Sequence, residues 1–144
     1  MRLLALLLVA ACSQSGAKKT EDLVADVKDF QEGLRWRDYD QAANHLQAEQ
    51  RTRFLDAHDD LDSDLRIDDY EVMRVHLTDQ RTAATVRVKY TWHRDSVGTV
   101  HETIVDQRWE LQGKVWRITG SEHKQGEELP PETLPVEAEG PPLP

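Results

Sequence analysis

The fold is decided by the run Ala84-Thr85-Val86-Arg87-Val88-Lys89-Tyr90-Thr91-Trp92. Apolar and polar side chains alternate along it, and a period of two is typical of a strand with one buried and one solvated face. Comparable runs rich in Val, Ile, Thr and aromatic residues cover 70–77, 97–111 and 115–119, with short polar breaks between them. The sequence therefore predicts an antiparallel meander of four strands, with Trp92, Trp109 and Trp116 on its apolar face.

Two of the predicted strands change the face on which their apolar residues lie. In the third run Val100 and Ile104 lie on the face opposite the later apolar residues, and in the first run the change falls between Val72 and Val75. A β-bulge, one extra residue on one strand of a pair, produces such a shift and bends the strand. We therefore expect a curved sheet, with Gln112-Gly113 forming the turn between its last two strands.

Amphipathic helices precede the sheet. Leu23, Val27, Phe30 and Leu34 recur at helical spacing, and Thr20 is a suitable N-cap for the helix that carries them. Short helical patterns follow from Asp38 and over 48–61. The predicted fold class is α+β, with N-terminal amphipathic helices packed on a curved, four-stranded antiparallel meander.

The first eleven residues have the pattern of an export signal, with Arg2 followed by a compact apolar run. The run is shorter than the ~20 apolar residues that span a bilayer. Val9-Ala10-Ala11-Cys12 resembles the lipobox of bacterial lipoproteins, in which the cysteine is lipidated and becomes the new N-terminus. Cys12 is the only cysteine of the chain, so lipidation accounts for an exported thiol with no partner in its own chain. An ordinary signal peptide with a chance cysteine is the alternative.

The resemblance to lipoproteins implies a membrane anchor at Cys12, followed by a polar tether over 12–19. Two or more acyl chains make a durable anchor. In Gram-negative lipoproteins, a residue such as Ser13 rather than Asp after the cysteine implies sorting to the outer membrane. We therefore expect a cell-envelope protein on the outer membrane, facing the periplasm, whose domain covers 20–122.

The C-terminal segment 123–144 differs in composition from the rest of the chain. It holds all six prolines and is rich in glutamate. Such a composition buries too little apolar surface to offset its ordering entropy. We expect a disordered, acidic, proline-rich tail, with a partner-binding proline motif as the alternative.

The net charge of −9 limits the partners. A strongly acidic exported domain is poorly suited to bind nucleic acid or an anionic membrane surface by electrostatics. We expect no nucleic-acid partner, and expect the membrane to be contacted through lipidated Cys12. The remaining partner classes are another envelope protein or a small apolar ligand.

The order of elements resembles the nuclear-transport-factor-2-like superfamily, whose α+β domains form a cone. The likeness rests on the run from Trp36 to Ala43, which matches the start of that fold's second helix, and on the ending from Trp109 to Ile118. It covers about residues 20–122. A cystatin-like sheet with one helix is the nearest alternative.

Cones of this superfamily often hold a pocket between sheet and helices. The resemblance implies a pocket lined by polar and aromatic residues: Tyr39, Tyr70, Trp92, His101, Gln107 and Trp109. Buried indole N–H groups need acceptors, and we expect His101, Thr103 or Gln107 to supply them. Trp36, at a helix break, is expected to pack on Leu34 or to stand at the rim of a pocket.

Some members of the superfamily are isomerases or cyclases, so an enzyme is an alternative to a binding protein. Ketosteroid isomerases need a carboxylate base and a protonated carboxylic acid in an apolar site. The predicted apolar strand faces contain no Asp, and Asp106 falls on a charged face. His101 is the candidate acid or base if the protein is an enzyme, but otherwise no catalytic residue is predicted.

A third reading concerns the acidic run between the last helix and the sheet. It places oxygen ligands at positions that resemble an EF-hand calcium loop, namely Asp60, Asp62, Asp64, Asp68 and Glu71. Leu65 stands where that loop needs glycine, and a strand rather than a helix follows. We expect an acidic connection and no cofactor, with Ca²⁺ as the alternative. The leading interpretation is a non-enzymatic, lipid-anchored envelope protein that binds a partner or ligand.

Overall fold

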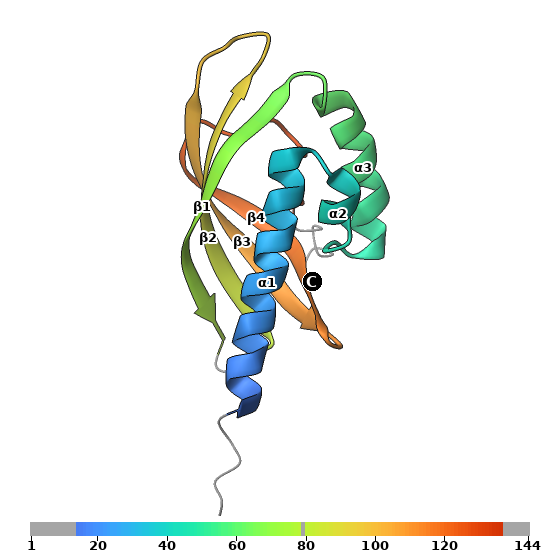
Figure 1. The fold of residues 1–144 in the computed structure, drawn as a ribbon, viewed down its shortest axis with the longest axis vertical. Coiled ribbons are helices and arrows are strands. Elements are labelled where there is room, and N and C mark those ends of the chain that lie inside the picture. Colours follow the sequence, from blue (N-terminus) through green and yellow to red (C-terminus); the bar gives the residue numbers. More distant parts are fainter. Residues whose placement is uncertain (1–13, 79, 137–144) are drawn as a thin grey trace, which may run out of the picture.

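The computed structural model describes residues 14–78 and 80–136 as one antiparallel sheet with helices on its concave side (Figure 1). The helices are α1 (Gln14–Trp36), α2 (Tyr39–Ala43) and α3 (Ala48–Leu61). The strands are β1 (Leu65–Leu77), β2 (Ala83–Arg94), β3 (His101–Gln112) and β4 (Val115–Gly126). The strands pair in the order β1-β2-β3-β4. The predicted α+β fold with a four-stranded meander is confirmed.

The faces of the strands also follow the sequence pattern. The inward residues of β2 are buried from Ala84 to Trp92, and Trp109 and Trp116 on the next two strands are fully buried. The turn between β3 and β4 is made by Gly113 at φ 66°, a conformation that glycine adopts without a steric penalty. The alternation therefore identified the core face of the sheet.

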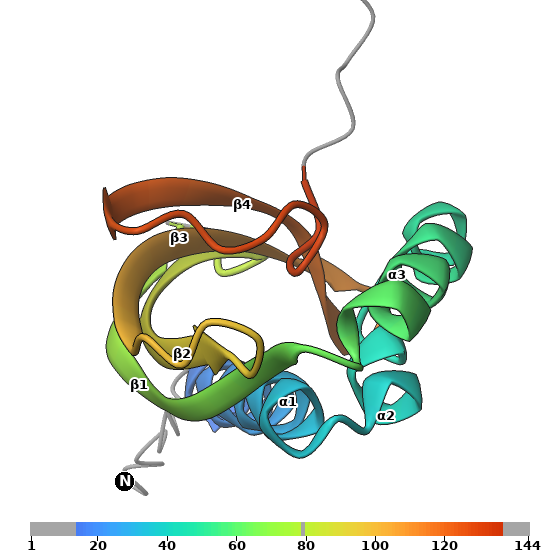
Figure 2. The same cartoon turned by 90° about the horizontal axis from the view of Figure 1, so that it is seen from above.

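The expected bulges are present and curve the sheet around the helices. The pairing of β1 with β2 shifts register between Val72 and Arg74, and that of β3 with β4 shifts between Ile104 and Val105. Further shifts lie at Ile67/Asp69 and at Arg108/Trp109. Figure 2 shows the resulting arc, with α2 and α3 at its open side and α1 next to β1.

Several strand bounds differ from the prediction. β1 begins at Leu65, and β4 continues to Gly126 instead of ending near residue 119. β3 begins at His101, because residues 95–100 form the turn and loop that follow β2. In that loop Val97 and Val100 are exposed, so their apolar character does not mark a strand.

The first helix begins six residues before the expected cap. α1 starts at Gln14, so the part of the predicted tether from residue 14 to 19 is helical. Thr20 lies inside the helix, where its hydroxyl donates to the Gly16 carbonyl at 3.1 Å. The predicted apolar stripe is correct, because Leu23, Val27, Phe30 and Leu34 are all buried.

The expectation of a disordered tail from residue 123 is wrong for its described part. Beyond β4, residues 127–136 fold back over the domain as an irregular segment that we call the strap. Its buried residues are Pro130, Thr133, Leu134 and Pro135. Figure 2 shows it returning along the inner side of β4 toward α3. The burial comes from residues distant in sequence, which composition alone does not reveal.

The predicted export signal and the predicted lipidation of Cys12 fall within residues 1–13, which lie outside the described residues. Within the described ranges, none of the helices combines the length and the apolar character that a membrane span requires.

Candidate functional site

The centre of the concave face is occupied by a closed ring of hydrogen bonds between α1, β2 and β3. Gln31 Nε2 donates to Gln107 Oε1 at 2.8 Å, and Gln107 Nε2 donates to the Tyr90 hydroxyl at 2.7 Å. The Tyr90 hydroxyl in turn donates to Gln31 Oε1. Trp109 Nε1 adds a bond to Gln107 Oε1 at 3.2 Å. We call Gln31, Tyr90 and Gln107 the polar ring.

The polar ring leaves no space for a ligand at this point. Its three residues and Trp109 are each 0% exposed, so solvent does not reach them. Burial strongly raises the pKa of the Tyr90 phenol, which keeps its proton and remains a donor. A fully satisfied buried network stabilises one arrangement of its members. The ring therefore fixes α1 against the sheet where the cone was expected to be hollow.

The six predicted pocket residues do not share one pocket. Gln107 and Trp109 belong to the filled interior. Trp92 and His101 line an opening at the end of the sheet, while Tyr39 and Tyr70 contact different helices. The prediction of a single cone pocket built from these residues is not met.

The opening beside His101 lies between the β2–β3 connection and the strap. Its volume is about 580 Å³, and its lining includes Val97, Leu129 and Pro130 besides Trp92 and His101. The His101 ring lies against the Trp92 indole, with centroids 4.7 Å apart. His101 is thus a half-buried rim residue. Among the described residues no Asp or Glu side chain is buried, so His101 has no buried carboxylate partner there.

The expected acceptors for the buried indoles are present. Trp92 Nε1 donates to Thr103 Oγ1 at 2.8 Å, and Trp109 Nε1 donates to Gln107. The Thr103 hydroxyl in turn donates a hydrogen bond to the carbonyl of Glu127 in the strap. Two of the three expected acceptors are thus correct, whereas Trp116 Nε1 donates to the Lys19 carbonyl at 3.2 Å, a partner that was not predicted.

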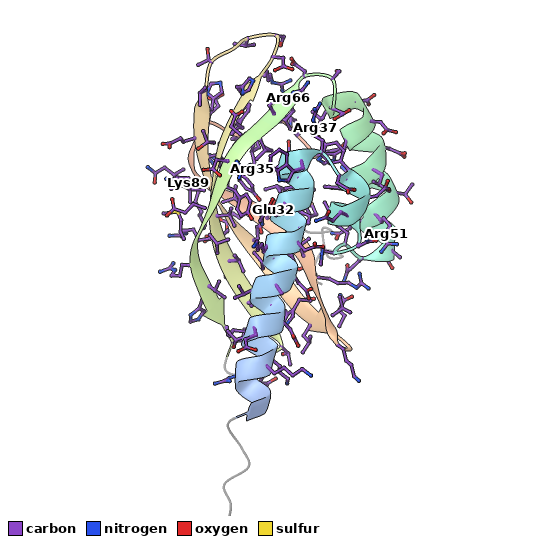
Figure 3. The ribbon with its side chains drawn as sticks, in the orientation of Figure 1. Glu32, Arg35, Arg37, Arg51, Arg66 and Lys89 are labelled. Carbon is purple, nitrogen blue, oxygen red and sulfur yellow. The ribbon has the colours of Figure 1, made fainter. Side chains whose placement is uncertain are left out.

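Tyr70 joins β1 to the last turns of α1. Its hydroxyl donates to Glu32 Oε1 at 2.7 Å, and Arg35 pairs with Asp69 at 3.2 Å. Partial burial and the neighbouring Glu32 carboxylate raise the pKa of Tyr70 to about 12. Figure 3 shows Glu32 and Arg35 between α1 and β1, with Lys89 on the outer side of the sheet. Tyr70 has a structural role here.

Trp36 stands between two surface hollows, and its side chain is 69% exposed. One hollow, of about 600 Å³, is lined by Tyr39 and residues of α2 and α3. The other, of about 430 Å³, is lined by Arg35, Arg37 and Arg66, which Figure 3 shows around the end of α1. Trp36 Nε1 donates to Glu32 Oε2 at 2.7 Å. Of its two predicted placements, the rim position is correct and packing on Leu34 is not.

The five predicted calcium ligands are not gathered around one point. Asp62 pairs with Arg37 at 3.7 Å, Asp68 with His93 at 2.7 Å, and Glu71 with Lys89 at 3.0 Å. Asp64 accepts from the Ser96 backbone N–H at 2.7 Å, a bond that lowers its pKa. Asp60 lies in α3, whereas Asp68 and Glu71 lie in β1. Across residues 14–78 and 80–136, no group of three potential ligands is arranged to hold a metal ion.

Sequence analysis missed Gln31 and the strap. Gln31 is four residues after Val27 and three before Leu34, so it lies on the apolar stripe of α1. A polar residue on a buried stripe needs a partner, and this signal would have identified Gln31. The strap offered a weaker signal, the pair Leu134 and Val136 within an otherwise polar stretch.

The fold and filled interior define a small α+β domain closed by its own C-terminal segment. The chain belongs to the family described as "Protein of unknown function (DUF3052)", whose model matches residues 42–139. The match runs from the end of α2 through α3, the sheet and the strap. Comparison with curated proteins and with solved structures found no match to the chain.

Proposed function

We propose that the protein is a lipid-anchored component of the bacterial cell envelope, with a nuclear-transport-factor-2-like domain of non-enzymatic binding type. The observation that carries the binding role is the filled interior. The polar ring occupies the place where an isomerase or cyclase of this kind would hold its substrate. A protein without an interior pocket binds its partners through its surface.

The arrangement of the elements favours one end of the molecule for that role. The start of α1 and the β2–β3 connection lie at opposite ends of the long axis (Figure 1). An anchor at Cys12, close in sequence to the start of α1, directs the β2–β3 connection away from the membrane. Val97 and Val100 on that connection are 64% and 60% exposed, and exposed apolar residues beside a hollow are typical of interaction surfaces.

The anchor is tested by replacing Cys12 with Ala and following the protein in membrane and soluble fractions, together with incorporation of an alkyne-labelled fatty acid. We expect the wild-type protein in the membrane fraction with label, and the C12A variant in the soluble fraction without it. A labelled C12A variant, or one that stays with the membranes, would contradict lipidation at Cys12.

The surface-binding role is tested with an apolar fluorescent dye on the folded domain. We expect no dye uptake by the native protein at neutral pH, because the polar ring and Trp109 leave no interior space. Stoichiometric uptake that is lost when a small residue of the inner face, such as the buried Val88, is replaced by Trp would place a ligand cavity in the interior. That result would favour the enzyme alternative.

A further inference from the structure

The strap is bound to the domain like a peptide in a groove. Pro130, Thr133, Leu134 and Pro135 are buried although the strap has no helix or strand. Leu134 is 8% exposed and is the largest apolar side chain among them. The strap therefore gains its contacts from the surface beneath it rather than from regular secondary structure.

The domain recognises the strap chiefly through side chains that donate to strap carbonyls. Thr103 Oγ1 donates to the Glu127 carbonyl, Ser121 Oγ to the Pro135 carbonyl at 2.9 Å, and Gln50 Nε2 to the Val136 carbonyl at 3.3 Å. Contacts to carbonyls hold the strap backbone without regard to most of its side chains, and between these contacts the backbone turns at 130–133, where the Thr133 N–H donates to the Pro130 carbonyl at 3.2 Å. We call Gln50, Arg53, His58, Thr103 and Ser121 the strap seat.

Two contacts of the strap seat depend on strap sequence. Arg53 makes hydrogen bonds of 3.0 Å and 2.6 Å to Glu132 Oε1. His58, stacked on Phe54 with centroids 4.0 Å apart, contacts the backbone of Thr133. The seat thus accepts an acidic residue next to a small one, flanked by prolines and followed by leucine.

The strap is not held as tightly as the sheet. Glu132 has φ 66°, which is unfavourable for a residue other than glycine. The opening of about 580 Å³ lies under the strap's first half, against Trp92 and His101. The His58 Nε2 and Gln50 Oε1 atoms are buried without a well-formed hydrogen bond. An occupant that relieved these defects would be bound more tightly than the strap.

We infer that the strap seat is a binding site for a proline-containing segment of a partner protein that turns as the strap does at 130–133, and that the strap is its intramolecular occupant. The segment it fits has the pattern Pro-Pro-acid-Thr-Leu-Pro that the strap carries at 130–135. Prolines lower the entropy that such a segment loses on binding. The inference rests on the proposed binding function and names the class of partner.

A tethered occupant competes at an effective concentration on the order of millimolar. A free peptide therefore binds the native chain weakly, and the site becomes accessible when the strap is weakened. The partner displaces the strap only if its own contacts exceed those of the tethered segment.

The test measures fluorescence anisotropy of a labelled peptide with the sequence of residues 127–136, added to the full chain. We expect the Leu134→Glu chain, whose strap loses its apolar anchor, to bind the wild-type peptide at least tenfold more tightly than the wild-type chain does. A peptide that itself carries Leu134→Glu should not bind. A natively folded Leu134→Glu chain that binds no more tightly than wild type would overturn the inference.

A charge exchange provides the matched control. Arg53→Glu in the Leu134→Glu chain should weaken peptide binding several-fold, and a peptide with Glu132→Arg should restore it. If Leu134→Glu does not fold, a chain with Pro130→Gly and Pro131→Gly loosens the strap and leaves the strap seat intact. Tighter binding of the wild-type peptide by this chain would support the inference, and unchanged binding would overturn it. Neither result bears on membrane anchoring at Cys12, so failure of the strap seat is distinguishable from failure of the proposed anchor.

Discussion

The concave face is filled in two different ways, by the polar ring on the α1 side and by the strap on the α3 side. In the polar ring every side-chain donor and acceptor that closes it has a partner, and each residue is 0% exposed. Under the strap, buried atoms of His58 and Gln50 have no well-formed hydrogen bond, and Glu132 has an unfavourable backbone conformation. The difference indicates a permanent closure on one side and an exchangeable one on the other.

The largest expected effect comes from breaking the α1 side with Trp109→Ala. Trp109 packs edge-on against Phe30 with centroids 5.8 Å apart, and its loss leaves a cavity beside the polar ring. We expect the free energy of unfolding to fall by about 3–5 kcal/mol, measured by urea denaturation. Trp36→Ala, at an exposed site, is the control and should change it by less than ~0.5 kcal/mol. Equal effects would mean that the interior is not packed as described.

The hydrogen bonds of the polar ring are tested by Tyr90→Phe. The substitution keeps the ring packing and leaves Gln31 Oε1 and Gln107 Nε2 buried without their partner. We expect a loss of about 2–3 kcal/mol in the free energy of unfolding. Tyr39→Phe is a matched control, because among the described residues the Tyr39 hydroxyl makes no hydrogen bond. A cost no greater than that of Tyr39→Phe would contradict the ring.

Leu134→Ala sharpens the comparison on the strap side. We expect the substitution to lower the free energy of strap opening by about 2 kcal/mol, the low end of the range for a buried leucine. The free energy of global unfolding should not show this loss. Hydrogen exchange reports both, through the Thr133 amide, which bonds the Pro130 carbonyl, and through amides of β2. Exchange at Thr133 should accelerate while β2 is little changed. If both regions exchange only on global unfolding, the strap is not an independent unit.

The smallest effect is a difference in pH dependence between two histidines. Burial lowers the pKa of His58 below its ordinary value near 6.5, so below that pH the unfolded chain binds more protons than the folded one. Stability that depends on neutral His58 is therefore present at pH 7 and lost as the pH falls below about 6.5. His93 has the opposite sign, because hydrogen bonding to Asp68 raises its pKa. Its contribution is complete at acid pH and is lost as the pH rises through its raised pKa.

Thermal unfolding between pH 5 and 8 distinguishes the two. His58→Gln should make the unfolding temperature fall less steeply as the pH is lowered from 7 to 5. His93→Gln should lower the unfolding temperature at the acid end of this range. The same slope in both variants would show that neither histidine titrates as its surroundings indicate.

Much of the fold could be predicted from local pattern. The inward faces of β2 and β3 and the bulge near Met73 follow from strand parity. The candidate site could not be predicted in the same way. Strand parity predicts that Gln107 and Trp109 face inward. Whether the space in front of them is empty depends on Gln31, which lies on α1 and donates a hydrogen bond to Gln107.

The sequence by itself determined the order of elements and which side of each strand is buried, because alternation and helical spacing are properties of neighbouring residues. Only the tertiary structure decided that the concave face is full and that a proline-rich segment is ordered over it. Ordering the strap costs conformational entropy, which is offset by contacts with Gln50, Arg53, Thr103 and Ser121. These residues come together only after the chain has folded, so no local sequence pattern predicts their contacts with the strap.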